Sequence, residues 1–144
     1  MKRSIDQRRA QAEPELIWNA FVDLLAMEDY ETLSALQRTA HLAFWYESEV
    51  ENGGHGQYLE NRGVDRLVET IQALEALGLA CHARLVSQIR QALPQNGEAV
   101  EWEEALSEDF LEDMDDRFAS CAPTITEALQ RHLEAHRAEY IELS

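Results

Sequence analysis

The sequence predicts an all-α protein, folded as a single compact domain of about six to eight helices with a central helix–turn–helix corner. Apolar residues recur at helical spacing along most of the chain, and no stretch alternates β-branched and polar residues as a half-buried strand does. Length agrees with one domain, because a chain of 144 residues buries about two-thirds of its unfolded surface.

The first twelve residues form a basic head. They contain four of the twelve Lys and Arg residues and a single acid. We expect a short amphipathic helix here, which is either loose or folded back on the acidic remainder of the chain. The chain therefore divides into the head, 1–12, which can be mobile, and a helical domain, 13–144.

Helix boundaries follow from apolar periodicity and end signals. Proline suits the first position of a helix, a glycine often follows the last, and a Thr-x-x-Glu capping box opens another. The helix before the central corner ends in three acids, Glu47, Glu49 and Glu51. These oppose the helix macrodipole and hint at selection for a negative surface. The expected helices are 13–30, 32–51, Val64–Leu77, Ala80–Leu93, one within 98–118, and Thr124–Leu143.

The segment 47–63 is the centre of the predicted fold, because a helix should end there, turn at Asn52-Gly53-Gly54 and restart. Glycine adopts left-handed dihedrals without side-chain strain, and asparagine tolerates them best among the other residues. A phosphate-binding loop is disfavoured, since no β-rich strand precedes the glycines and the surroundings are acidic. The residues expected to shape the corner are Glu49, Asn52, Gly53, Gly54, Gln57, Tyr58, Asn61 and Gly63.

The pattern Glu49-Val50-x-Asn52-Gly53-Gly54-x-x-Gln57-Tyr58-x-x-Asn61-x-Gly63 resembles the signature of a small bacterial helical domain of otherwise unknown function. The best-known members of that family are DNA-mimic (DMP-type) proteins. The similarity continues through the helical pair and more weakly into the acidic C-terminal third. Family members usually carry an aromatic residue where this chain has His55. The resemblance implies the helical fold, a helix-turn-helix transcription regulator as the class of partner, and a homodimer.

Charge is the main functional signal. The chain has 28 acidic and 12 basic residues, for a net charge of −16, which repels DNA, RNA and anionic membranes and favours basic partners. Between 98 and 116 there are ten acids and no basic residue, whereas exposed helices usually mix signs at i, i+4. The candidate partner-binding residues are Glu98, Glu101, Glu103, Glu104, Glu108, Asp109, Glu112, Asp113, Asp115 and Asp116.

Apolar residues interleaved with these acids keep helical spacing, so the segment should fold against the core and display its acids outward. In a continuous helix, Glu101, Glu104 and Glu108 would share one side. The acidic face could instead be centred on Glu112, Asp115 and Asp116. The alternative to a binding surface is a solvated face that only keeps the protein soluble.

Other site types have little support. His132 and His136 stand at i, i+4 and could hold a metal, but local spacing fixes no third ligand. Cys81 and Cys121 lack a CxxC spacing, and we expect them to be reduced thiols in a cytoplasmic protein. No export signal or membrane-spanning run is evident. We expect no enzymatic activity, metal or cofactor.

The sequence therefore predicts an acidic protein-binding module that acts as a DNA mimic. Duplex DNA presents one phosphate charge per roughly 1.7 Å of axis, both strands counted, and helical carboxylates can approximate part of that pattern. Such a surface would occupy the basic groove of a DNA-binding protein, and direct binding of nucleic acid is not expected. The alternatives are an acidic adaptor or immunity-type protein that masks a basic partner unrelated to DNA, and a metal-assisted enzyme.

Overall fold

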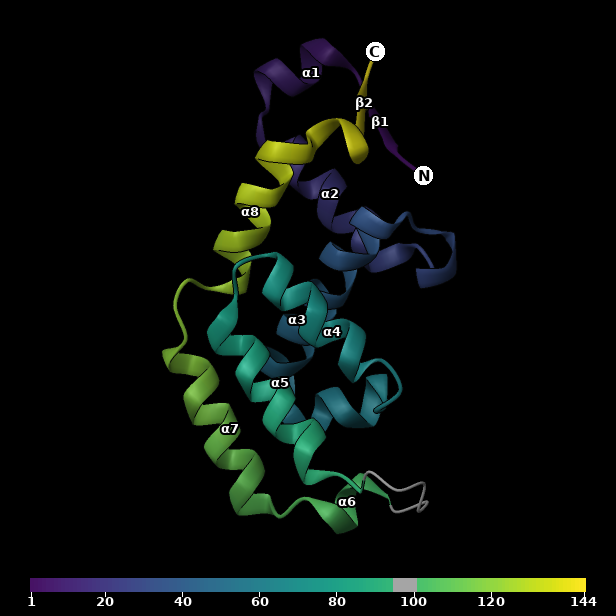
Figure 1. Cartoon of the computed structure of the whole chain (residues 1–144). Helices are drawn as coiled ribbons and strands as arrows, with labels where there is room; N and C mark the ends of the chain where they lie inside the picture. Colours follow the sequence, from purple (N-terminus) through teal and green to yellow (C-terminus); the bar gives the residue numbers. More distant parts are fainter. Residues whose placement is uncertain (95–100) are drawn as a thin grey trace.

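The longest helix, α3 (Ala35–Arg62), runs through the middle of the molecule and contacts α2, α4, α7 and α8 (Figure 1). The computed structural model describes residues 1–94 and 101–144. In chain order their elements are β1 (Arg3–Ile5), α1 (Gln7–Ala12), α2 (Glu15–Met27), the 3-10 turn η1 (Tyr30–Thr32), α3, α4 (Leu67–Ala76), α5 (Ala80–Ala92), α6 (Trp102–Ala105), α7 (Glu108–Ser120), α8 (Ile125–His136), the 3-10 turn η2 (Arg137–Glu139) and β2 (Ile141–Leu143). The prediction of an all-α domain is confirmed.

The apolar stripes read from the sequence form the core. Phe21, Leu24 and Leu25 of α2 are fully buried against α3 and α8, and Phe21 meets the ring of Tyr140 edge-on. Helices α4 and α5 pack on each other as the expected hairpin. Gly78 adopts a left-handed φ of 77° in their short connection, as glycine does after a helix end.

The two chain ends form a small parallel sheet that the sequence analysis did not predict. β1 pairs with β2, so that Arg3 lies opposite Ile141 and Ile5 opposite Leu143. The expected last helix is therefore too long, because α8 ends at His136, the 3-10 turn η2 follows, and Ile141–Leu143 are extended. Strands of three residues are too short for alternation to show in the sequence.

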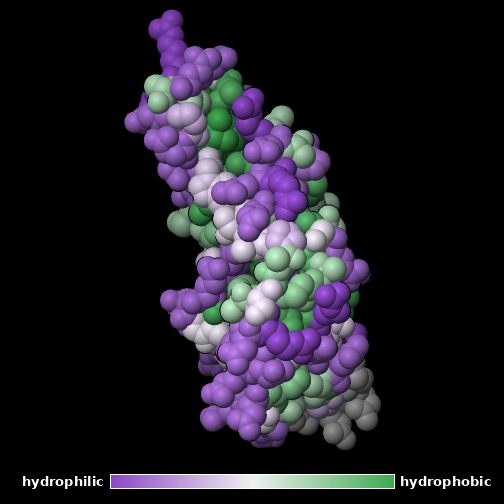
Figure 2. All heavy atoms as spheres, turned by 90° about the vertical axis from the view of Figure 1, so that its left-hand side faces the viewer, coloured by the Kyte–Doolittle hydropathy of each residue, from purple (hydrophilic) through white to green (hydrophobic). Residues whose placement is uncertain are grey.

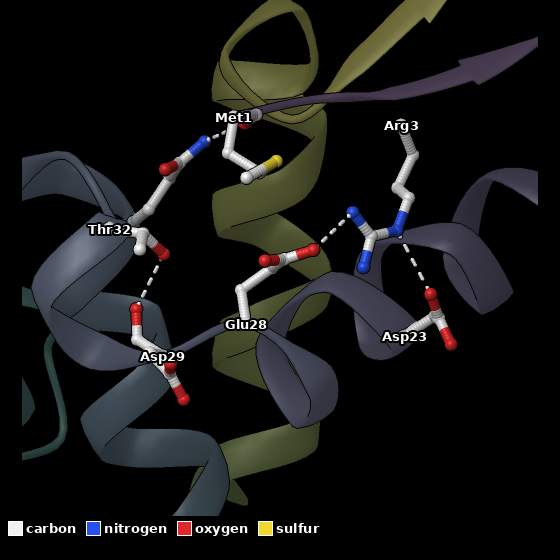
Figure 3. Close-up of polar contacts among 7 residues, drawn as sticks. Met1, Arg3, Asp23, Glu28, Asp29 and Thr32 are labelled. Carbon is white, nitrogen blue, oxygen red and sulfur yellow. Dashed lines mark hydrogen bonds and ion pairs between the residues drawn. The ribbon is translucent and has the colours of Figure 1, made fainter.

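Side chains fix the head to the helical body (Figure 3). Arg3 Nε lies 2.9 Å from Asp23 Oδ2, and its Nη1 lies 2.8 Å from Glu28 Oε1. The buried Gln37 side chain donates to the backbone carbonyls of Met1 and Glu139 at 2.6 and 2.8 Å. The head thus folds back on α2 and α3.

One expectation about the cysteines is wrong. Cys81 at the start of α5 and Cys121 just after α7 form a disulfide, with their Cα atoms 5.6 Å apart. The two residues are 40 positions apart, so local spacing gave no sign of the pair. The bond ties the C-terminal end of α7, the helix that carries most of the candidate acids, to the hairpin.

Candidate protein-binding surface

The acidic segment forms two helices rather than one. Leu106 and Ser107 between α6 and α7 have extended backbones, with ψ values of 124° and 158°. Leu106 is buried, and the Ser107 side chain accepts a hydrogen bond from the Phe110 N–H at 3.1 Å, which starts α7 as an N-cap. The predicted side shared by Glu101, Glu104 and Glu108 is therefore wrong. Glu98 lies outside the described residues.

Helix α7 is amphipathic as predicted. Met114 is buried, and Phe110, Leu111 and Phe118 pack against the core on the same side. The outer side carries exposed acids, and Figure 2, which faces α7 and α8, shows hydrophilic side chains over much of the lower part of this face. The exposed candidates are Glu101, Glu103, Glu104, Glu108, Asp109, Glu112, Asp113 and Asp116.

Most of the acids on α7 have no cation beside them in the described part of the chain. Asp113 is 3.7 Å from Arg117, but both side chains are exposed and such a pair is weak. Glu108, Glu112 and Asp116 stand at i, i+4 and i+8 and make no ion pair with a described residue. They form a row along the helix, with a rise of about 6 Å from one to the next.

Asp115 differs from the other candidates because it points inward. Its Oδ1 accepts a hydrogen bond from the backbone N–H of His55 at 2.8 Å and lies 2.7 Å from His55 Nδ1. On the other side of the ring, Nε2 is 2.7 Å from the hydroxyl of Tyr46. His55 and Tyr46 are fully buried. Asp115 is therefore an internal contact rather than a member of the free acidic row.

The protonation states in this group follow from burial. Desolvation lowers the pKa of His55, although Asp115 opposes the shift, and desolvation raises the pKa of Tyr46 well above its ordinary value. The neutral ring then donates from Nδ1 to Asp115 and accepts at Nε2 from the Tyr46 hydroxyl. A carboxylate, an imidazole and a hydroxyl that are linked in this order by hydrogen bonds also occur in catalytic triads. Here the hydroxyl is fully buried, so the group serves the fold.

The corner in α3 depends on these contacts. Gly53 and Gly54 have non-helical dihedrals, and Gly54 has a φ of 78°. The helix restarts at His55, whose backbone N–H is capped by Asp115 from α7. Across the corner, Asn61 Nδ2 donates to Glu49 Oε2 at 2.6 Å.

Most of the remaining motif residues have a packing or backbone role in the structure. Tyr58 packs edge-on against Tyr46 at 5.0 Å, Gly63 ends α3 with a φ of 72°, and a side chain at Gly53 would overlap Gln57. Asn52 is exposed on the helix just before the corner.

Two of the three acids at the predicted helix end have internal partners, which corrects their interpretation as negative surface. Glu47 is buried and accepts from the N–H of Thr126 at 3.0 Å and from its hydroxyl at 2.8 Å, at the start of α8. Desolvation raises the pKa of Glu47, and these hydrogen bonds oppose the shift. Glu49 is buried against Asn61. Only Glu51 is exposed.

We predict that Gly54→Ala lowers the free energy of unfolding by about 2 kcal/mol. The substitution places a Cβ in a left-handed backbone and 2.5 Å from Asp115 Oδ2. Gly78→Ala is a matched control, because Gly78 has nearly the same φ and no atom within 4 Å of the added Cβ. Urea titration of both variants separates the two effects. Equal losses in the two variants would show that contact with Asp115 contributes nothing.

The histidine pair on α8 is not arranged as a metal site. His132 is buried, and its Nε2 is 2.6 Å from the hydroxyl of Tyr140, which itself donates to the Leu36 carbonyl. Across residues 1–94 and 101–144, no three His, Cys, Asp or Glu side chains gather where they could hold a metal ion.

In the described segments, no helix has the length and apolar character needed to cross a membrane.

Comparison with known proteins identifies the family. No curated protein and no solved structure matches the chain. The sequence model of one family, described as DMP19-like protein, matches residues 31–141, which include the corner in α3, the α4–α5 hairpin, α7 and α8. The chain therefore belongs to the DMP19-like protein family.

Proposed function

We propose that this protein is a DNA mimic whose α7 surface occupies the basic DNA-binding surface of a partner protein. The observation that supports the proposal most is the row formed by Glu108, Glu112 and Asp116 on a single helix, whose carboxylates make no ion pair with a described residue. From one carboxylate to the next the row rises about 6 Å along the helix axis, which is close to twice the axial rise of about 3.4 Å per phosphate along one strand of DNA. Asp109 and Asp113 lie beside this row.

The rigidity of α7 also supports this function. The helix is anchored by the buried Met114, by the contact of Asp115 with His55 and by the disulfide at Cys121. Carboxylates on an anchored helix lose little freedom when they bind, so more of the electrostatic attraction remains as affinity. The repulsion within the row is then a cost that the fold tolerates for the sake of a partner.

We infer the class of partner from the resemblance to DNA-mimic proteins. Because the sequence resembles DNA-mimic proteins, we propose a helix-turn-helix transcription regulator as the partner and a homodimer as the active form. Such a partner works on DNA, so the interaction would take place in the cytoplasm.

The experiment begins with the partner retained by the protein from its native host. We predict that changing Glu108, Glu112 and Asp116 together to their amides weakens the affinity for that partner by at least about tenfold, because charge attraction drives the association. The wild-type affinity should also fall steeply with added salt. Binding is measured by titration calorimetry across a range of salt concentrations.

The matched control changes Glu60, Asp65 and Glu75 to amides, which removes the same charge from exposed positions outside α7. This variant should bind the partner as the wild type does. Competition with the partner's own DNA then distinguishes a mimic from an adaptor that masks another basic surface. Equal losses in both variants, or binding at the same time as DNA, would contradict the proposal.

A further inference from the structure

A pocket of about 260 Å³ lies between the end of α2, η1, α3 and the start of α4. None of its lining residues belongs to α7, so the proposed mimic surface does not use it. Its walls carry the rings of Tyr30, His41, Trp45 and Tyr58. The pocket therefore combines flat, partly apolar walls with the guanidinium groups of Arg62 and Arg66.

Arg62 is the unusual group in this pocket. Its guanidinium lies over the ring of Trp45, 3.9 Å from the centroid, and it makes no hydrogen bond or ion pair with any residue in the described ranges. Desolvation lowers its pKa, and the nearby charge of Glu49 opposes the shift. The Glu49 carboxylate itself accepts a hydrogen bond from the Asn61 side chain. The chain has 28 acidic residues, yet none of the described ones forms an ion pair with Arg62. All five N–H donors of this partly desolvated guanidinium are therefore available for a ligand.

A second guanidinium adds to the positive charge. Arg66 lies 3.7 Å from the centroid of Tyr30, and its only ion pair is with Glu31 at 2.8 Å in the described part of the chain. Both side chains of that pair are largely exposed, so the contact is weak and can be exchanged. Of the two carboxylates that line the pocket, Glu28 is ion-paired with Arg3, which also pairs with Asp23 (Figure 3), and Asp29 is exposed.

His41, which lines the pocket, supplies a neutral acceptor. The Leu25 carbonyl near the end of α2 lies 3.0 Å from His41 Nδ1 and accepts the Trp45 indole N–H at 3.1 Å. His41 must carry its proton on Nδ1 to make this bond, which leaves Nε2 as an acceptor. Desolvation lowers the pKa of His41, and the charges of Arg62 and Arg66 act in the same direction, so the ring is neutral at pH 7.

We propose that this pocket binds a small organic anion, a flat ring that carries a carboxylate or a phosphate monoester. The anionic group pairs with Arg62, whose planar guanidinium matches both groups in a bidentate manner, and Arg66 adds attraction. The ligand ring packs among Tyr30, Trp45 and Tyr58, and a ligand hydroxyl or amine can donate to His41. Such a ligand would be recognised independently of the protein partner on α7.

The indole N–H resonance of Trp45 in a ¹⁵N-labelled sample reports on this pocket, and Trp45→Phe assigns it. The probes are a nucleoside monophosphate, benzoate and inorganic phosphate, with the uncharged nucleoside and benzyl alcohol as neutral counterparts, all at constant ionic strength. We predict a saturable shift of this resonance with at least one of the ring-bearing anions. Saturation by the nucleotide alone would identify the phosphate form of the ligand, and saturation by benzoate alone would identify the carboxylate form.

Two variants test the role of the guanidinium. Arg62→Gln should weaken the anion affinity by at least about tenfold, which is the loss expected for one charge-assisted contact. Arg84→Gln removes the same charge from an exposed position on α5 outside the pocket and should bind normally. The amide variant of Glu108, Glu112 and Asp116 should also bind normally, so failure of the mimic proposal would leave this one standing.

Three results would overturn the inference. The first is no saturation by any anion at about 10 mM, the second is equal binding of the neutral counterparts, and the third is an unchanged affinity in Arg62→Gln. Arg62 is exposed and makes no hydrogen bond with the described residues, so its substitution should leave the fold intact. Unchanged dispersion of the remaining NMR resonances would verify this.

Discussion

Acidification from pH 7 to pH 5 should lower the free energy of unfolding by about 4 kcal/mol, mainly through two buried histidines. His82 is 2% exposed and His132 is 8% exposed, and desolvation lowers the pKa of each to about 4. The unfolded chain takes up protons near pH 6.5 at both positions, whereas the folded chain does not until pH is close to 4. Stability is therefore present at neutral pH and is lost as pH falls through this window.

Neighbouring groups also lower the pKa values of these two histidines. His55 further lowers the pKa of His82, and His136 further lowers that of His132. His82 Nδ1 is buried without a hydrogen-bond partner in the described residues, and the ring lies edge-on to Phe118. Nothing in these contacts favours a charged imidazole.

Urea titrations at half-unit steps of pH measure this loss. His82→Leu and His132→Leu should each remove about half of it, about 2 kcal/mol over the window. His136→Gln changes an exposed histidine on the same helix as His132 and is the control. The titrations span pH 7 to pH 5. A pH dependence of undiminished size in both leucine variants would assign the loss to other groups.

The sequence predicts the helices of this fold well because their signals are local. The stripe of Phe21, Leu24 and Leu25 is contained in a few turns of α2, and Thr124 caps α8 by a hydrogen bond from the Glu127 N–H. One local signal was overlooked, since Ser107 followed by Glu108 and Asp109 is typical of a helix start. That signal would have separated α6 from α7.

Contacts between residues that lie far apart in the sequence were not predicted. His55 and Asp115 are 60 positions apart, and either residue alone reads as an ordinary member of its helix. The carboxylate of Asp115 was therefore assigned to the acidic face, although it caps the second half of α3. Cys81 with Cys121 and β1 with β2 were missed for the same reason. Helical periodicity identifies the side of a helix that is buried, but not the residue that it meets.

The acidic row on α7 could be predicted from the sequence, whereas the pocket could not. The charge of α7 was readable because ten acids stand in one run, whereas Arg62 and Trp45 are 17 positions apart in a segment without unusual composition. Their stacking depends on the turn of α3 at Gly54, which the sequence predicts, but the turn alone does not indicate which side chains it brings together. Only the folded chain brings these groups to one pocket.

Asp115→Ala should lower the free energy of unfolding by about 3 kcal/mol, because it leaves a buried imidazole N–H and a helix-capping N–H of His55 unpaired. Asp116→Ala is the matched control, since it removes the same charge from an exposed neighbour and should change stability by less than about 0.5 kcal/mol. Asp115→Asn keeps an amide oxygen as acceptor and should fall between the two. Thermal and urea unfolding measure all three variants.

A double-mutant cycle with His55→Phe isolates the contact itself. Phenylalanine keeps a ring at position 55 and has no N–H to donate, so Asp115→Ala should cost less in this background by about 1 to 2 kcal/mol. The remaining cost is the loss of the backbone cap at residue 55. If the cost is the same in both backgrounds, the ring contact adds no stability. The hydrogen bond from the His55 backbone N–H to Asp115 would then account for the whole loss.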